Sequence, residues 1–212
     1  EDLSNTLHDL ERFINEPLVE MGPIVRAALV YYQFETAHPF LDGNGRLGRL
    51  LITLMLINDG VLHSCLLYPS FQFKKNRSEY YWQLTSVRER GTYEEWIEFF
   101  CNSLLESAKD SVGSLKNLVD LHYRPTATIT ENLGRTAANG QRLLGILEEY
   151  PIVDTAFIAA QLDIGRSTAS SLVKSFEELG ILRPLDESRQ RYRQYGYEEY
   201  LSILREDAEP IR

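Results

Sequence analysis

The chain is 212 residues long, which is enough for one large domain or two small ones. Its formal net charge is −9, with thirteen basic against eighteen acidic residues up to position 135 and nine against thirteen beyond it. Neither part is basic, which argues against a protein that coats nucleic acid by bulk charge attraction. No apolar run is long enough to span a membrane, so we expect no membrane association.

Two cysteines, Cys65 and Cys101, lie far apart in apolar surroundings without the spacing of metal ligands. Buried free thiols in a reducing compartment are expected, with a disulfide as the alternative. With no secretory leader in the sequence, this favours a cytoplasmic protein. The sequence does not begin with Met, and we expect that an N-terminal segment is missing from it.

Two helices are predicted before the first glycine-rich stretch. Residues 3–15 place apolar side chains at helical spacing with charges between them, which predicts an amphipathic helix. Gly22-Pro23 begins a second helix, because proline is favoured in the first turn. This helix runs towards Pro39, which disfavours helical backbone at the residue before it. That residue is His38, which we expect at a corner between helix and loop.

Residues 38–50 read His-Pro-Phe-Leu-Asp-Gly-Asn-Gly-Arg-Leu-Gly-Arg-Leu and concentrate reactive groups in one short stretch. Its glycines allow backbone conformations in which main-chain N–H groups converge on an anion. A buried helix should follow, and its N-terminus favours negative charge. The apolar positions that predict this helix are Leu47, Leu50, Leu51 and Leu54. We expect a phosphate site with His38 as a base beside it and Phe40 anchored in the core; a capped glycine-rich turn is the structural alternative.

The pattern His-Pro-Phe-x-Asp-Gly-Asn-Gly-Arg-x-x-Arg resembles the signature of the Fic family of nucleotidyl transferases, and residues 38–49 match every fixed position. The resemblance implies a helical core that uses ATP and Mg²⁺ to transfer AMP to a Tyr, Thr or Ser hydroxyl of a target protein. It implies that His38 is the general base and that Asp42 binds the metal. The residues that it assigns to the phosphates are Gly43, Asn44, Gly45, Arg46 and Arg49.

After the motif, Asn58-Asp59-Gly60 predicts a helix end and residues 71–90 predict the next helix. The resemblance implies that Asn76 and Tyr80 contact the base side of the nucleotide, with packing in the core as the alternative. Helical spacing continues to position 122, and the Pro- and Gly-containing stretch beyond it predicts a domain boundary. We therefore expect a Fic core over residues 1–125 and a linker over 126–138.

Residues 139–205 predict a small winged helix-turn-helix domain, with three helices, a glycine-containing turn and a two-stranded hairpin over 183–193. It resembles the module that follows the core in many bacterial Fic proteins, so the predicted fold class is mainly α. Asp154 and Ser167 are expected to cap the second and third helices. The candidates for DNA or partner contacts are Arg166, Ser167, Thr168, Lys174, Arg189, Arg191 and Arg193.

Other functions remain open at this point. The chain is a DNA-binding regulator if the C-terminal domain dominates, and that domain equally suits a protein partner. The same motif can also remove AMP, or move phosphocholine, UMP or a phosphate. The family's inhibitory Ser/Thr-x-x-x-Glu-Gly/Asn motif has no match, because Ala127 stands where Glu131-Asn132 would need a hydroxyl. We expect that helix upstream or on a partner, and a homo-oligomer is compatible with the sequence.

Overall fold

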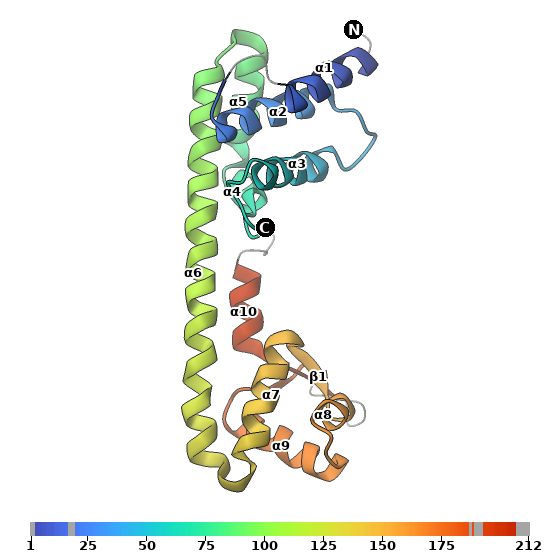
Figure 1. The fold of residues 1–212 in the computed structure, drawn as a ribbon, viewed down its shortest axis with the longest axis vertical. Coiled ribbons are helices and arrows are strands. Elements are labelled where there is room, and N and C mark those ends of the chain that lie inside the picture. The colour runs from blue at the N-terminus through green and yellow to red at the C-terminus, as the bar shows by residue number, and fades with distance from the viewer. Residues whose placement is uncertain (1–2, 17–19, 187, 189–192, 207–212) are drawn as a thin grey trace. The chain divides into compact units, whose positions relative to one another are not determined.

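The structure is a computed structural model, and it describes residues 3–16, 20–186, 188 and 193–206. The chain is mainly α-helical, as predicted, and divides into two compact units, the first ending at Ser111 and the second beginning at Val112 (Figure 1). Within the described residues, no helix is long and apolar enough to cross a membrane. The helices of the first unit are α1 (Leu3–Asn15), α2 (Pro23–Ala37), α3 (Asn44–Asn58), α4 (Pro69–Lys75), α5 (Arg77–Arg90) and the first part of α6 (Tyr93–Leu133).

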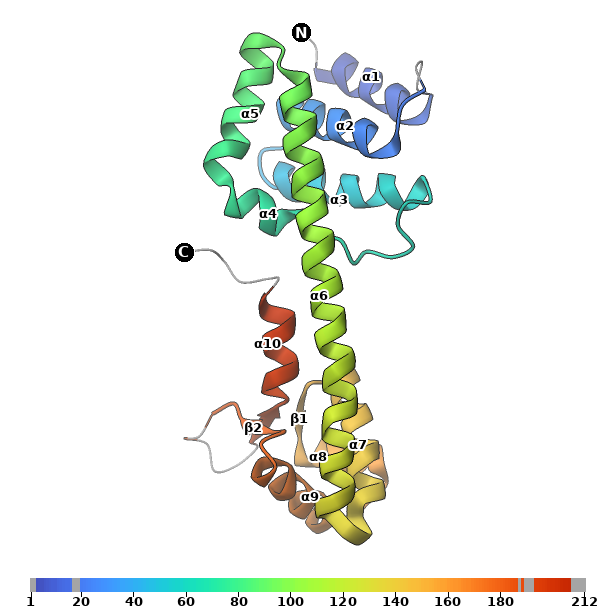
Figure 2. The same cartoon turned by 90° about the vertical axis from the view of Figure 1, so that its left-hand side faces the viewer.

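The first unit is built around the contact between α2 and α3, which lie side by side (Figures 1 and 2). Both helices begin and end where the sequence predicts, with Gly22 before α2 and Pro23 in its first turn. The indole of Trp96 on α6 donates a hydrogen bond to the carbonyl oxygen of Ala28 on α2, at 3.0 Å. Aromatic rings pack around this bond, including Tyr31 and Phe73 with centroids 5.5 Å apart. Buried aromatic packing therefore fixes α2, which leads directly to the motif.

The prediction that four leucines bury α3 is wrong. Leu47, Leu50 and Leu54 are about half exposed, while Ile52, Met55 and Leu56 are buried. The reason is Gly48: a Cβ atom there would lie 2.8 Å from side-chain atoms of both Tyr31 and Glu35 on α2. The two helices approach most closely at this glycine, so the buried face of α3 is the one centred on it. Helical spacing of leucines alone does not identify that face.

Two predicted helix boundaries are also wrong. The helix expected over 71–90 is two helices, α4 and α5, which meet at Asn76. Helix α6 continues through Pro125 to Leu133, and a 3₁₀ turn over Gly134–Thr136 follows, so the expected linker 126–138 is largely helical. Proline removes the N–H that would bond the carbonyl four residues earlier, at Leu121. The Tyr197 hydroxyl donates to that carbonyl instead, at 3.4 Å, which reduces the cost of proline inside the helix.

Within the described residues, the second unit has the last part of α6, four further α-helices and a three-stranded antiparallel sheet with strand order β1-β3-β2. Strands β2 and β3 pair as an antiparallel hairpin, but β3 begins at Gln194, just after the predicted range 183–193. Strand β1 was not predicted, since three residues show no alternation. Helix α10 lies alongside α6, where Arg124 and Glu199 form an ion pair at 2.7 Å (Figure 2). The elements are the last part of α6, α7 (Ala137–Glu149), β1 (Ile152–Asp154), α8 (Thr155–Leu162), α9 (Arg166–Glu178), β2 (Arg183–Pro184), β3 (Gln194–Gly196) and α10 (Glu198–Glu206).

The caps in the second unit are partly as predicted. The Asp154 carboxylate accepts a hydrogen bond from the Phe157 N–H at 2.8 Å and caps α8. Helix α9 begins two residues earlier than expected, with Gly165 rather than Ser167 at its N-cap. The Gly165 backbone is extended there, which is the usual conformation of an N-cap residue. The Ser167 side chain therefore lies inside the helix, in its first turn.

Candidate active site

His38 occupies the predicted corner after α2. Its backbone is left-handed, with φ 46° and ψ 57°, and its N–H still donates to the carbonyl oxygen of Phe34 at 3.0 Å. A residue other than glycine in this conformation stores strain of about 1–3 kcal/mol, a feature that concentrates at functional sites. Pro39 makes a helical continuation unfavourable, so the chain turns sharply here. The turn leaves the His38 imidazole exposed at the mouth of the loop.

The loop from Pro39 to Gly43 is held by the side chain of Asn44. The amide oxygen of Asn44 accepts from the Phe40 N–H at 2.9 Å, and its amide nitrogen donates to the Phe40 carbonyl at 2.5 Å. Asn44 is 2% exposed, whereas the Phe40 ring is 51% exposed. The expectation that the Phe40 ring anchors the loop is therefore wrong, and the backbone of Phe40 is the anchor. Asn44 offers only its backbone N–H to a ligand.

Gly43 turns the chain into α3 with φ 83°, a left-handed conformation that glycine adopts without steric cost. The first helical hydrogen bond runs from the Leu47 N–H to the Gly43 carbonyl at 3.0 Å. The N–H groups of Asn44, Gly45 and Arg46 precede it, so they have no acceptor within the helix. Three aligned donors at the positive end of the helix dipole make an anion site.

Arg46 and Arg49 both lie in α3, because the helix begins before them, and they line one pocket of about 230 Å³. Arg46 is mostly exposed and lies 3.5 Å from the Asp42 carboxylate. Arg49 is less exposed, and its Nη1 lies 2.9 Å from where a Cβ of Gly45 would be. Any side chain at position 45 would displace this guanidinium. The glycine thus lets Arg49 lie against the open N–H groups of the loop.

Asp42 has an almost fully exposed side chain. Its Oδ1 accepts from the Gly43 N–H at 2.7 Å, which fixes the carboxylate at the start of the helix. The remaining lone pairs face solvent beside the two arginines. One fixed carboxylate next to a phosphate site is a usual setting for Mg²⁺, which takes its other ligands from phosphates and water.

Glu35, which the sequence does not mark as part of the site, lies behind Arg49. It is on the last turn of α2, and its Oε1 would lie 2.8 Å from a Cβ at Gly48. Burial raises the pKa of the Glu35 carboxyl, and the charges of Arg49 and then His38 oppose that rise. The Glu35 carboxylate therefore interacts electrostatically with both Arg49 and His38. Its position three residues before His38, one helical turn, is the signal in the sequence that indicates a shared face.

Beneath Arg49, the hydroxyls of Tyr31 and Tyr80 are joined by a buried hydrogen bond of 2.9 Å. Burial and the Glu35 charge raise the pKa of Tyr31 to about 12, while the Tyr80 hydrogen bond and Arg49 oppose the rise. Burial, together with Tyr31, also raises the pKa of Tyr80 well above its ordinary value. Both phenols are therefore neutral hydrogen-bonding groups at physiological pH. Helix α3 therefore packs against the hydrogen-bonded pair of Tyr31 and Tyr80, which lies inside an aromatic core.

Neither of the two candidates for the base side of the nucleotide lines the pocket of Arg46 and Arg49. Asn76 is exposed and lines a different pocket, between α5 and α6, and its amide donates to the Gln72 carbonyl at 3.1 Å. Tyr80 is only 7% exposed. Both cysteines are free, but Cys65 is exposed rather than buried, and it lines the pocket of the two arginines. No spacing pattern in the sequence predicts this placement of Cys65, because it depends on the path of the loop after α3.

In the second unit, Arg166, Ser167 and Thr168 are exposed in the first turn of α9. Lys174, further along the same helix, is also exposed, and its Nζ forms an ion pair with Glu178 at 3.8 Å. Arg193 is half-buried just before β3. The remaining candidates, Arg189 and Arg191, lie outside the described residues. The described candidates thus gather mainly on one helix.

Comparisons with known proteins agree with the motif. Residues 1–56 match the model of the Fic/DOC family. The chain is 32% identical over 111 residues to the protein adenylyltransferase fic-1 of Caenorhabditis briggsae, covering 52% of this chain and 20% of that protein. It is 30% identical over 115 residues to fic-1 of Caenorhabditis elegans, covering 54% and 21%. The chain therefore spans about a fifth of the length of these relatives.

A solved structure, the crystal structure of a Fic family protein from Desulfovibrio desulfuricans G20, is similar with a TM-score of 0.49 and 21% sequence identity. The similarity covers 92% of this chain and 54% of that one. The family assignment depends instead on the sequence matches, which include the whole loop from His38 to Arg49. The N-terminal region of the chain, residues 1–56, therefore resembles the Fic/DOC family, and about half of the chain is similar to distantly related Fic protein adenylyltransferases.

Proposed function

We propose that this chain transfers AMP from ATP to a Tyr, Thr or Ser hydroxyl of a target protein. One observation carries the proposal: the first-turn N–H groups of α3 and the side chains of Arg46 and Arg49 belong to one helix start, which follows the exposed His38 corner after one short loop. An anion site next to an exposed imidazole is what nucleotidyl transfer requires. The names of the curated relatives, which are protein adenylyltransferases, support the same reaction.

In the proposed reaction, the His38 imidazole removes the proton of the target hydroxyl as general base. The hydroxyl oxygen forms a bond to the α-phosphorus of ATP, and the bond from that phosphorus to the bridging oxygen of pyrophosphate breaks. AMP is then esterified to the target and pyrophosphate leaves. The chain's contribution is to position these groups and to stabilise charge on the phosphates.

The phosphates are assigned to the loop of Gly43, Asn44 and Gly45 and to the two arginines; the open backbone donors there are the N–H groups of Asn44, Gly45 and Arg46, since the Gly43 N–H donates to Asp42. A guanidinium presents a planar pair of donors that matches two phosphate oxygens. The exposed Asp42 carboxylate would hold Mg²⁺, which when bound supplies positive charge to the phosphates. The chain's own part is to hold Asp42 in place through the Gly43 N–H.

For the base side of the nucleotide, Asn76 is kept only as the candidate from the family resemblance; its exposed side chain lines a pocket other than that of the two arginines. Tyr80 is placed differently. Its hydroxyl is bonded to Tyr31 in the core below Arg49, which supports a role in holding the arginine rather than in contacting the base.

The test is His38→Ala in the full chain, assayed with labelled ATP on the chain itself and on lysate proteins. Loss of the general base is expected to lower AMP transfer about 10²–10⁴-fold. His8→Ala on α1 is the matched control, because His8 is also exposed but lies outside the motif. Transfer at the wild-type rate by a folded His38→Ala chain would show that His38 is not the base.

A second function is proposed for the second unit, namely contact with DNA or a protein partner through α9. Its support is the row of exposed polar and basic groups in the first turn, beginning at Arg166. A gel shift with the full chain distinguishes the two ligands, because DNA binding by basic groups weakens steeply with salt. Arg166→Ala should then reduce the shift without changing AMP transfer.

A further inference from the structure

Among the described residues, five buried side-chain polar atoms have no hydrogen-bond partner, and two of them belong to charged groups beside the motif. These two are Nε of Arg49 and Oε1 of Glu35. A buried carboxylate oxygen or guanidinium N–H without a partner is costly, and such groups are normally satisfied in native proteins. The two are complementary, since one is a charged donor and the other a charged acceptor. Both lie at the close approach of α2 and α3, where Glu35 contacts Gly48, the residue before Arg49.

The Arg49 guanidinium has two edges that can donate hydrogen bonds, and the two edges lie in different surroundings. The outer nitrogen Nη1 lies over Gly45, beside the open N–H groups that begin α3. The inner edge, with Nε, is buried towards the interior of the unit. A guanidinium can bind one anion on each edge because its five N–H donors form a rigid, planar fork. Glu35 and a phosphate therefore need not compete for the same donors.

We infer that Glu35 is a positioning residue for the anion site of the proposed function. When an anion occupies the outer edge of Arg49, the Nε–H donates to Glu35 Oε1, and this charged hydrogen bond holds the guanidinium over Gly45. The substrate group it serves is the polyphosphate of a nucleotide. Glu35 touches no substrate atom and acts only through Arg49.

The sign of the effect separates this role from simple charge repulsion. A carboxylate near an anion site weakens anion binding through space, so its removal by itself should strengthen binding. A carboxylate that holds an arginine in place does the opposite, and its removal should weaken binding. Glutamine at position 35 keeps the acceptor oxygen but removes the charge, so it should lie between glutamate and alanine.

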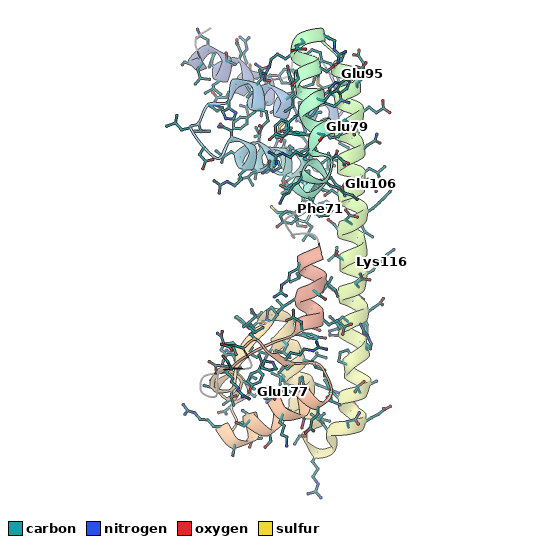
Figure 3. The ribbon with its side chains drawn as sticks, turned by 180° about the vertical axis from the view of Figure 1, so that it is seen from behind. Phe71, Glu79, Glu95, Glu106, Lys116 and Glu177 are labelled. Carbon is teal, nitrogen blue, oxygen red and sulfur yellow. The ribbon has the colours of Figure 1, made fainter. Side chains whose placement is uncertain are left out.

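The experiment measures the affinity of the full chain for inorganic tripolyphosphate by calorimetry, which needs neither Mg²⁺ nor a target protein. Glu35→Ala is expected to weaken binding about tenfold, and Glu35→Gln less than that. In an Arg49→Ala background, the further effect of Glu35→Ala should fall below about twofold, since coupled residues are not additive. Glu95→Gln is the control, because Glu95 is exposed on α6 within the same unit (Figure 3).

Tighter binding by Glu35→Ala, or equal effects of Glu35→Ala with and without Arg49, would overturn the inference. The inference rests on the proposed function, but the two fail differently. If the wild-type chain binds no tripolyphosphate, the phosphate site itself is wrong. If the wild-type chain binds it and Arg49→Ala weakens binding while Glu35→Ala does not, the site stands and only the role of Glu35 is lost.

Discussion

Helices α3 and α9 both begin after a glycine and carry arginine in their first turn, yet they present different surfaces. Before α3, Gly43 has φ 83°, and the buried Asn44 ties the loop backbone together. Before α9, Gly165 has φ −64° and an extended backbone that another residue could adopt. Arg49 is partly buried against a pocket, whereas Arg166 is exposed.

The comparison shows that a glycine, an arginine and a helix N-terminus are not sufficient for an anion site. At α3, the loop geometry is fixed from both sides, by the Asn44 side chain and by the close packing of Gly48 against α2. These restraints hold donors and guanidinium in place before a ligand arrives, which lowers the entropic cost of binding. At α9, the first-turn side chains of Arg166, Ser167 and Thr168 are exposed.

The largest expected difference between the two helices concerns their arginines. Arg49→Ala should lower AMP transfer about 10²–10³-fold, the usual effect of removing one preorganised donor to developing charge. Arg166→Ala, the same substitution at the start of α9, should leave transfer unchanged. Rates with labelled ATP check both, and a comparable loss in the two variants would contradict the assignment of the phosphate site to α3.

A second pair of substitutions compares helix packing in the two units. Gly48→Ala should destabilise the first unit by about 1–3 kcal/mol, since its methyl group would collide with Tyr31 and Glu35. Gly145→Ala in α7 meets no atom within 4 Å and should stabilise its helix by about 0.5–1 kcal/mol. Urea unfolding checks the first by tryptophan fluorescence, because both tryptophans, Trp82 and Trp96, belong to the first unit, and the second by circular dichroism.

A smaller effect is expected from the two side chains that accept backbone N–H groups beside a helix start. Asn44→Ala loses two hydrogen bonds to the Phe40 backbone and should cost about 2 kcal/mol of stability as well as AMP transfer. Asp154→Ala loses the cap of α8 and should cost about 1 kcal/mol without affecting transfer. If Asn44→Ala transfers AMP normally, the shape of the loop does not depend on this side chain.

The sequence predicted the helices α1, α2 and α3, the corner at His38 and the start of α8 at Asp154, because their signals are local. Proline, glycine and a capping carboxylate act on neighbouring residues, so no knowledge of the fold is needed to interpret them. The signature from His38 to Arg49 likewise predicted a resemblance to the family from a continuous stretch, and the region that matches the Fic/DOC model contains it.

What the sequence missed depends on residues distant in the chain. Pro125 stays inside α6 because Tyr197 bonds the Leu121 carbonyl from the other end of the unit. The buried face of α3 is set by Gly48 against α2 rather than by its leucines.

By itself, then, the sequence determined the chemistry of the motif, since the reactive groups are adjacent residues of one loop. Only the tertiary structure decided how those groups are held: Asn44 closes the loop, and Glu35 and Tyr31 of α2 lie behind Arg49. The reason is physical. Local backbone preferences act between neighbours in the chain, while burial and charge act between whatever residues the packing of helices brings together.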